Sequence, residues 1–349
     1  MKSEELRKLT YELVKQKRIP INGGIEILSN CNFRCVHCCN KMEPSNYMTY
    51  DFASQLAEQL EKLGTMHIYL TGGEVLLHPN FSEIFKCFRK KGIAVSILTN
   101  ISLLNEKYIK LFENYTPYNI DISLYGSSNK TYEAITGVKN VFDIVKENIY
   151  KLSEKNIPFS LKTVAIKENF DDLQEMMNFS KKVGKVLNIY TDIRPLNNGS
   201  KQSKLHQLSI DQIIEVEKKI NKWIAPRGKN DEHSKEKQKR KEGGYLYFCE
   251  IGKYTFFITH QGILHGCVKE RIHGYDLNKV SFAEGFEKML EDFVLKKSKG
   301  KNKCATCKYI KYCDYCPAQF ELETGCMYTP PKDVCDLAYN RYLYFNHDI

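Results

Sequence analysis

Thirteen cysteines dominate the chemistry of this sequence, and four of them stand within residues 31–39. Their odd number and short spacings disfavour disulfides and favour metal ligation in a reducing compartment. Three of them follow the spacing C-x3-C-x2-C: Cys31, Cys35 and Cys38. Three thiolates on one loop can hold one corner of an iron–sulfur cubane and leave one iron free for a non-protein ligand. A zinc site needs a fourth ligand, which His37 or Cys39 can supply, so zinc stays open for this loop.

Eight cysteines lie beyond residue 245, and seven of them, leaving out Cys326, form a second group: Cys249, Cys267, Cys304, Cys307, Cys313, Cys316 and Cys335. Four of them form two C-x2-C pairs that are only five residues apart in "CATCKYIKYCDYC". An ordinary zinc ribbon separates such pairs by about 15 to 20 residues. The spacing therefore favours another kind of metal site, with a zinc knuckle as the alternative. Of the remaining cysteines, Cys87 lies in a helix pattern, where we expect a small buried side chain.

The composition is that of a chain with a real hydrophobic core. Its 349 residues are 42% hydrophobic, enough for one large or two medium domains. The N-terminus is charged and no apolar run reaches about 18 residues, so we expect no membrane span and a cytoplasmic protein. The net charge of +10 comes largely from residues 226–244 and 296–303, which we expect to be solvated loops. We therefore disfavour nucleic-acid binding, also because cluster thiolates add negative charge that the formal count omits.

The cysteines need a scaffold, and the sequence around them alternates between strand and helix patterns. Six short runs rich in Ile, Val and Leu indicate buried strands at 24–28, 67–71, 93–99, 119–125, 159–165 and 186–190. Helix patterns between them include Phe52, Leu56, Leu60 and Leu63, and also Leu173, Met176 and Met177. This alternation predicts an α/β fold with parallel strands and right-handed crossovers, either doubly wound or a complete or partial barrel.

Polar residues stand at the carboxyl ends of these strands, where parallel sheets and barrels place their sites. The second and third strands run into Thr71, Gly72, Gly73, Glu74, Thr99 and Asn100. The last three carry or precede Asp121, Ser123, Lys162, Thr163, Asp192 and Arg194. Each of these residues alone can be a helix cap or a buried hydrogen bond. Together they predict one pocket around one mouth.

With the cysteine loop at the end of the first strand, the sequence resembles the radical S-adenosylmethionine (SAM) superfamily over about residues 20 to 200. The wording "CNFRCVHC" is close to that common in the family. The resemblance implies that Cys31, Cys35 and Cys38 hold a 4Fe–4S cluster whose open iron binds SAM. It also implies reductive cleavage of SAM to a 5′-deoxyadenosyl radical that abstracts hydrogen from a substrate. The implied fold is a partial six-stranded (β/α) barrel.

The same resemblance implies a cofactor-binding role for the strand ends. "TGGE", residues 71–74, matches the glycine-rich motif whose backbone binds the methionine ammonium, and we expect the Glu74 carboxylate to face the cavity. Ser123 matches a fourth-strand position that reaches the ribose or the carboxylate. The expected contacts of cofactor or substrate are completed by Asn100, Lys162, Thr163 and Arg194.

Beyond residue 245 the cysteine layout resembles the SPASM domain that accompanies radical enzymes acting on peptides and proteins. The resemblance implies two auxiliary iron–sulfur clusters. The outer one would be held by Cys304, Cys307, Cys313 and Cys335, and the inner one by Cys249, Cys267 and Cys316. Two features depart from the family pattern: "CDYC" has two residues between its cysteines instead of three, and the inner set lacks a fourth cysteine. A non-cysteine ligand or an open iron would complete the inner cluster, and Cys326 is a rival to Cys335.

The expected organisation is an N-terminal helix (1–20), a radical SAM partial barrel (21–224), a basic linker (225–244) and a SPASM domain (245–349). We expect a peptide substrate, matured by a thioether or carbon–carbon crosslink or by epimerisation. About 24 residues precede the first strand, so a separate protein would bind any leader peptide, and a flavodoxin or ferredoxin would supply electrons. The alternatives are a sulfatase-maturase-like or cofactor-biosynthesis enzyme and, from another class, a multi-cluster electron-transfer or zinc-binding protein.

Overall fold

The computed structural model describes residues 17–40, 47–220, 239–298 and 300–345. Its strands are β1 (Asn22–Leu28), β2 (His67–Gly72), β3 (Ala94–Thr99), β4 (Asn119–Ser123), β5 (Phe159–Val164), β6 (Leu187–Tyr190), β7 (Thr255–Ile258), β8 (Ile263–His265) and β9 (Tyr275–Asp276). Its α-helices are α2 (Tyr50–Lys62), α3 (Phe81–Lys90), α4 (Glu106–Asn114), α5 (Asn129–Thr136), α6 (Val141–Glu154), α7 (Leu173–Lys182), α8 (Ile210–Lys219), α10 (Phe282–Met289), α11 (Pro317–Thr324) and α12 (Lys332–Phe345).

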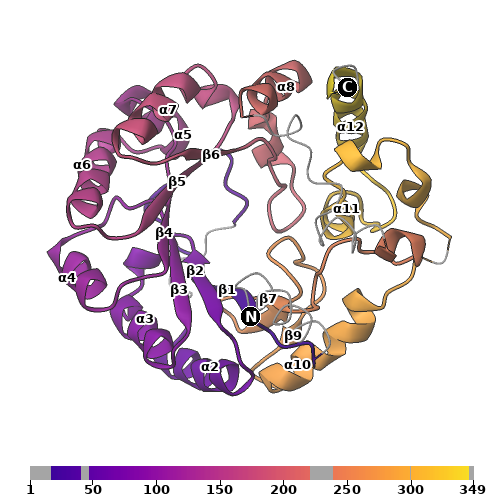
Figure 1. The fold of residues 1–349 in the computed structure, drawn as a ribbon, viewed down its shortest axis with the longest axis horizontal. Helices are drawn as coiled ribbons and strands as arrows, with labels where there is room; N and C mark the ends of the chain where they lie inside the picture. The colour runs from indigo at the N-terminus through magenta and orange to yellow at the C-terminus, as the bar shows by residue number, and fades with distance from the viewer. Residues whose placement is uncertain (1–16, 41–46, 221–238, 299, 346–349) are drawn as a thin grey trace, which may run out of the picture.

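One sheet runs through the described part of the chain, with the strand order β6-β5-β4-β3-β2-β1-β7-β8-β9. Neighbours from β6 to β7 are parallel, whereas β7, β8 and β9 pair antiparallel. The sheet curves, and helices α2, α3, α4, α6 and α7 lie on its outer side (Figure 1). The six predicted strands and the partial (β/α) barrel are therefore confirmed.

The two faces of the barrel strands differ in chemistry. Ile25 and Ile27 in β1 are completely buried, as is Leu60 in the predicted apolar stripe of α2. Alternate strand positions are instead polar, for example Glu26 in β1 and Lys162 in β5. Because neighbouring side chains of a strand point to opposite faces, the apolar set packs under the helices and the polar set faces the barrel interior. The polar side chains on the interior face of the sheet are therefore available to a site inside the barrel.

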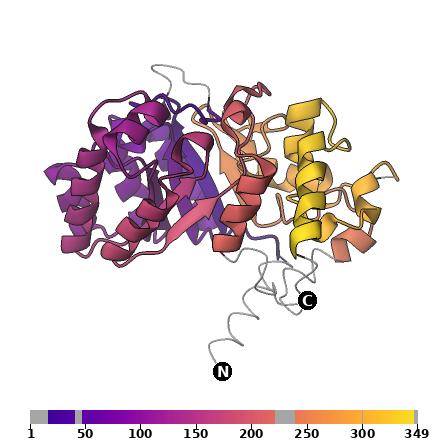
Figure 2. The same ribbon diagram turned by 90° about the horizontal axis from the view of Figure 1, so that it is seen from above.

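The region after residue 245 continues the barrel sheet. Strand β7 pairs with β1, with Asn22 opposite Thr255, so the sheet crosses the boundary that we expected between two domains. On the other side of the molecule α8 and α12 lie side by side (Figure 2). There the fully buried Arg341 binds Glu217 with both its Nε and Nη2, at 2.8 and 2.6 Å. The C-terminal region is consequently held at both edges of the barrel.

The two basic stretches are not simply solvated. Arg240 is buried and donates to the carbonyl oxygens of Tyr247 and Val294 at 2.7 and 2.8 Å, while Ser298 and Asn302 are buried as well. The expectation of solvated loops is wrong at these positions, because these side chains satisfy backbone groups inside the C-terminal region. Residues 225–238 of the expected linker and 1–16 of the expected N-terminal helix lie outside the described residues.

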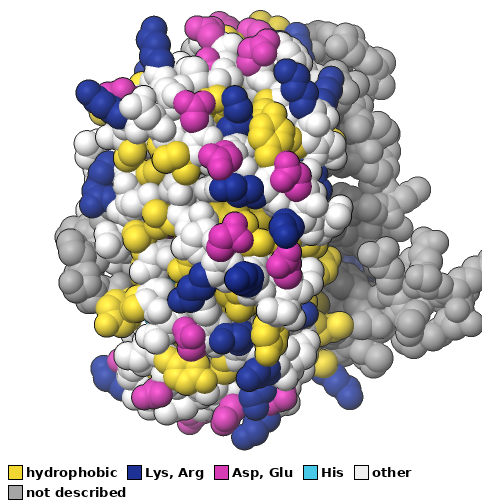
Figure 3. Space-filling view, turned by 90° about the vertical axis from the view of Figure 1, so that its left-hand side faces the viewer, with side chains coloured by type: hydrophobic (Ala, Val, Ile, Leu, Met, Phe, Trp, Pro, Cys, Tyr) yellow, Lys and Arg dark blue, Asp and Glu magenta, His cyan; other side chains and the backbone are white. Residues whose placement is uncertain are grey.

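The outer face of the barrel carries intermixed basic and acidic side chains (Figure 3). On this face no continuous basic stripe runs along the helices. Among the described helices, none has the length and apolar character needed to cross a membrane.

Candidate active site

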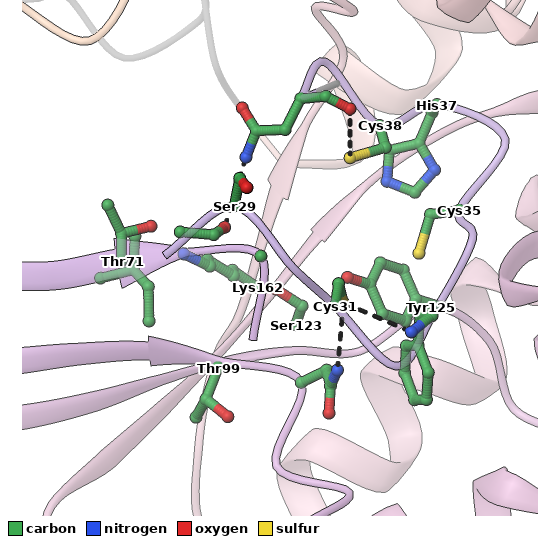
Figure 4. Close-up of a pocket in the computed structure, with 16 residues that line it drawn as sticks. Ser29, Cys31, Cys35, His37, Cys38, Thr71, Thr99, Ser123, Tyr125 and Lys162 are labelled. Atoms are coloured by element: carbon green, nitrogen blue, oxygen red, sulfur yellow. Dashed lines mark hydrogen bonds between the residues drawn. The ribbon is translucent and has the colours of Figure 1, made fainter. Parts of the chain in front are cut away.

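The cysteine loop opens directly from the end of β1 and borders a cavity of about 170 Å³. Cys31, Cys35 and Cys38 all line this cavity, and Figure 4 shows their thiols on one loop around strand residues such as Ser123 and Lys162. The loop is tied to the end of α5, because the amides of Arg34 and Val36 donate to the carbonyls of Thr136 and Ile135. The loop and its contacts with α5 thus bring the three thiols together at one cavity.

The two glycines after β2 are required by the close approach of this loop. Gly72 has a φ of +148°, and a Cβ there would lie 2.1 Å from the carbonyl oxygen of Leu28. A Cβ on Gly73 would lie 2.0 Å from the carbonyl oxygen of Asn30. Only glycine fits such contacts. The motif thus brings the end of β2 against the start of the cysteine loop, and both glycines line the cavity as expected.

Most of the predicted strand-end residues meet at this cavity: Thr71, Gly72, Gly73, Asn100, Ser123 and Lys162. Its wall also includes residues that sequence reasoning did not assign to cofactor binding: Ser29, Phe33, His37, Asn40, Leu98, Thr99 and Tyr125. Period-two alternation offered a signal for Tyr125, which follows Ser123 by two positions. Ser29 likewise follows the first strand directly. Phe33 and Leu98 are apolar and carry no such signal.

Glu74 does not face the cavity, contrary to our expectation. It is completely buried, and its carboxylate accepts hydrogen bonds from Thr99 Oγ1 at 2.6 Å, Asn100 N at 2.7 Å and Leu76 N at 3.1 Å. Burial raises the pKa of Glu74, while these three donors act to lower it. Glu74 therefore joins the end of β2 to the end of β3 and positions Asn100, while its expected role in cofactor binding stays a prediction.

Thr163 and Arg194 are also absent from the wall of this cavity. Thr163 is buried on the face of β5 opposite to Lys162, and its hydroxyl lies 3.5 Å from Asn169 Nδ2. Arg194 instead links two regions, because its Nη2 lies 3.1 Å from Cys39 Sγ and its Nη1 donates to the Val268 carbonyl at 3.1 Å. Neither residue lines this cavity, so their expected contacts with cofactor or substrate stay predictions.

The buried thiols of this cavity suit a metal cluster whose metal ions supply positive charge. Burial raises the pKa of Cys31 to about 11 and that of Cys38 to about 12, and burial together with the charge of Cys38 raises the pKa of Cys35 further. Burial also lowers the pKa of His37 to about 4 and that of Lys162. Buried thiols become thiolates when a metal supplies the compensating positive charge. The donor set, three converging thiols with an amide and a hydroxyl nearby, fits such a cluster.

The C-terminal cysteines divide into two neighbourhoods that match the two predicted sets. After burial, the charges of Cys316 and Cys249 are the main causes that raise the pKa of Cys267, to about 12. In the other set, burial and then the charges of Cys335 and Cys307 raise the pKa of Cys304 to about 11. Cys313 is likewise influenced by Cys304 and Cys335, and Cys335 by Cys307. Electrostatic influence of this kind reflects proximity, so both sets are brought together by the fold.

Cys326, the rival of Cys335, stands apart from both neighbourhoods. Its surroundings are the turn that it occupies, where its amide donates to Thr324 Oγ1 at 3.2 Å, and a hydrogen bond with the Thr329 side chain lowers its pKa. Among the described residues no three His, Cys, Asp or Glu side chains are arranged around a single metal ion. Thiolates of a cubane bind different irons and need not meet at one point.

Several known proteins are similar to this chain in sequence or in fold. Residues 25–180 match the model of the radical SAM superfamily. The AdoMet-dependent heme synthase of Methanosarcina barkeri (strain Fusaro / DSM 804) is 23% identical over 343 residues, which are 88% of this chain and 96% of the relative. The subtilosin biosynthesis protein AlbA of Bacillus subtilis (strain 168) is 26% identical over 169 residues, 48% of this chain and 38% of AlbA.

The fold similarity extends beyond the barrel. Streptococcus suis SuiB bound to S-adenosylmethionine has a TM-score of 0.69 at 14% identity, covering 95% of this chain and 81% of SuiB. Native anSMEcpe with bound AdoMet has a TM-score of 0.64 at 14% identity, covering 93% of this chain and 97% of anSMEcpe. Residues 25–180 thus match the radical SAM superfamily, and the chain is built as an α/β partial barrel with a cysteine-rich C-terminal region whose fold is similar to that of SuiB and anSMEcpe.

Proposed function

We propose that this radical SAM enzyme matures a ribosomally made peptide and carries two auxiliary iron–sulfur clusters. One observation carries the proposal: the fold similarity to SuiB and anSMEcpe covers more than nine-tenths of the chain, including the region with both C-terminal cysteine sets. Solved structures of SuiB with its precursor peptide SuiA, and of anSMEcpe with a peptide, belong to the same group of similar folds. The alternative class, a multi-cluster electron-transfer or zinc-binding protein, does not account for the strand-end residues around the first cavity.

Residues of this chain hold the reactants in place. Cys31, Cys35 and Cys38 would hold the 4Fe–4S cluster, which when bound supplies the electron that cleaves SAM to the hydrogen-abstracting radical. The Asn100 carboxamide and the Lys162 ammonium face the same cavity and are donors suited to the carboxylate and hydroxyl oxygens of SAM. Phe33, Thr99 and Asn100 form a buried part of this wall, which would limit the access of water to a reactive intermediate.

The auxiliary sets have different ligand counts. The outer set offers four cysteines, enough for a complete 4Fe–4S cluster, whereas the inner set of Cys249, Cys267 and Cys316 offers three. A non-cysteine ligand or the substrate itself would therefore complete the inner cluster. We also propose that a flavodoxin or ferredoxin donates the electrons and that a separate protein binds any leader peptide.

A second candidate function is cofactor biosynthesis. It is favoured by the M. barkeri heme synthase, because that relative matches this chain over 88% of its length and not only over the barrel. In this reading the substrate is a tetrapyrrole rather than a peptide, while the roles of the first cysteine loop and of SAM stay the same. Product analysis with the two kinds of substrate separates the candidates.

Anaerobic reconstitution followed by iron and sulfide analysis tests the proposal. Three clusters correspond to about twelve irons per chain, and Cys31→Ala, Cys35→Ala or Cys38→Ala should each remove about four and abolish formation of 5′-deoxyadenosine. Stoichiometric zinc with almost no iron would contradict the enzyme assignment. Mass spectrometry of a peptide encoded beside the gene, after turnover in D2O, should then show a mass loss for a crosslink or a gain of deuterium for an epimerisation. A modified tetrapyrrole with an unchanged peptide would favour the second candidate.

A further inference from the structure

A second cavity, of about 330 Å³, lies beside the first one at the ends of β1 and β7. Its wall includes Glu26, Asn40, Thr259, His260 and Arg271. Asn40 belongs to the walls of both cavities, and Glu26 pairs across the sheet with Thr71, which lines the first cavity. A molecule in the second cavity would therefore lie next to the SAM site.

Three buried groups in this wall form a connected set. Glu26 Oε1 lies 2.6 Å from His260 Nδ1, and Glu26 Oε2 lies 3.5 Å from Arg271 Nη2. The three side chains are only 7–9% exposed. Because a carboxylate is an acceptor only, the His260 ring must place a proton on Nδ1 to bind Glu26. Glu26 thus orients the ring and fixes which nitrogen is left over.

The nitrogen left over has nothing to bind. His260 Nε2 is buried and has no hydrogen-bond partner among the described residues. A buried polar atom without a partner is unfavourable, so its place in a cavity wall calls for a ligand. The other titratable wall residue that the structure describes, His265, is already paired with Glu270 at 3.0 Å.

Several contacts hold the Arg271 guanidinium in place, and one of its nitrogens stays available for a ligand. Its guanidinium stacks over the Phe257 ring, 4.3 Å from the centroid, and its Nε donates to the Val268 carbonyl at 3.1 Å. Within the described residues, the hydrogen bonds of Arg271 go from Nε and Nη2 and leave Nη1 over. A guanidinium fixed in this way is suited to a carboxylate ligand.

We propose that this second cavity binds a carboxylate group of the substrate between Arg271 and His260. Glu26 already balances the charge of Arg271, so the carboxylate binds together with one proton, which lies between a carboxyl oxygen and His260 Nε2. The result is a buried set without net charge in which each group is hydrogen-bonded, which is the condition for burying charge at low cost. Such an anchor would hold the neighbouring carbon atoms of the substrate toward the SAM cavity. This inference rests on the proposed function for its substrate, but not for its binding site.

The carboxylate can come from an acidic side chain of a peptide or from a non-peptide acid. Three probes separate these sources in calorimetric titrations of the reconstituted enzyme with SAM bound: N-acetylglutamate N-methylamide, its glutamine analogue, and glutarate. The glutamate probe should bind roughly tenfold more tightly than the glutamine probe, because charge-assisted hydrogen bonds are about twice as strong as neutral ones. Glutarate binding as tightly as the glutamate probe would assign the anchor to a non-peptide acid, and weaker glutarate binding to a peptide.

Two variants test whether the preference for the glutamate probe arises in the second cavity. His260→Gln, which can still donate to Glu26, and Arg271→Gln should each reduce the preference for glutamate over glutamine to less than about threefold. His273→Gln is the matched control, because this histidine pairs with Glu321 at 2.9 Å without lining the cavity, and it should retain the full preference. If Arg271→Gln lowers the melting temperature, the His260 variant decides.

Equal binding of the two amide probes by the wild-type enzyme would overturn the proposal, as would a preference that survives in both cavity variants. Failure of the proposed function is visible separately. An enzyme that does not bind or cleave SAM, yet prefers the glutamate probe, would contradict the proposed function and leave the carboxylate site standing.

Discussion

Replacement of Glu74 by alanine tests whether this residue organises the site or binds the cofactor. Its carboxylate accepts from two backbone amides, those of Leu76 and Asn100, and from the Thr99 hydroxyl, all in a completely buried place. The hydroxyl can turn to another acceptor, but the two amides cannot. We therefore expect a structural defect first, and a weaker effect on SAM through the displaced Asn100.

The size of the defect follows from the unsatisfied amides. Each buried donor without a partner costs about 1–3 kcal/mol, so the two amides together cost about 4 kcal/mol. At about 2 °C for each kcal/mol in a chain of this size, the melting temperature of Glu74→Ala should fall by about 8 °C. The affinity for SAM should change by less than about threefold, because no direct contact is lost.

The assay is a pair of measurements on anaerobically reconstituted enzyme: melting by differential scanning calorimetry, and SAM binding by equilibrium dialysis. Lys162→Met is the contrasting variant, because Lys162 lines the cavity and carries a charge whose burial is unfavourable. Its melting temperature should stay equal or rise while its SAM affinity falls roughly tenfold. A Glu74 variant that melts like the wild type and loses SAM affinity more than about tenfold would refute the reasoning and place the carboxylate on the cofactor.

Three further outcomes are expected. Burial lowers the pKa of Lys162, so the unfolded chain binds more protons between that pKa and 10.5, and wild-type stability relative to Lys162→Met should rise with pH across this window in urea titrations. Cys335→Ala should lose about four irons on analysis, whereas an iron loss in Cys326→Ala would contradict the two cysteine sets. Arg341→Met removes the guanidinium from the buried Glu217 carboxylate, so it should cost about 3–5 kcal/mol, and an unchanged melting curve would mean that this ion pair does not join α8 to α12.

The barrel could be predicted because its strands have a clear pattern in the sequence. The runs that become β1 to β5 are short, apolar and followed by amphipathic helices, and the cysteine spacing needs no long-range information. Strands β7 to β9 have only two to four residues, too few for a period to show, so the continuation of the sheet could not be predicted.

The expected and observed positions of Glu74, Thr163 and Arg194 differ for related physical reasons. Position along a strand places a residue at the mouth, but the face that it occupies depends on the pleat. Lys162 and Thr163 are neighbours in β5, so period-two alternation already excluded that both face the cavity. For Glu74 the sequence offered no such rule, because the direction of the chain after Gly72 and Gly73 depends on how closely the cysteine loop approaches. Arg194 could be placed after the sixth strand, but its partners come from regions far away in the sequence.

The continuous sheet also determines how the two cysteine regions relate to each other. Strand β1 leads into the first cysteine loop at its carboxyl end and pairs along one edge with β7, whose hairpin leads to Cys267. Arg194 adds a second link, between Cys39 and the Val268 carbonyl. The separation between the first cavity and the inner cysteine set is therefore set by strand register and one partly buried guanidinium. Because metal binding contributes folding free energy, cluster loss in the C-terminal region should disturb the second cavity, whose Arg271 donates to that same Val268 carbonyl.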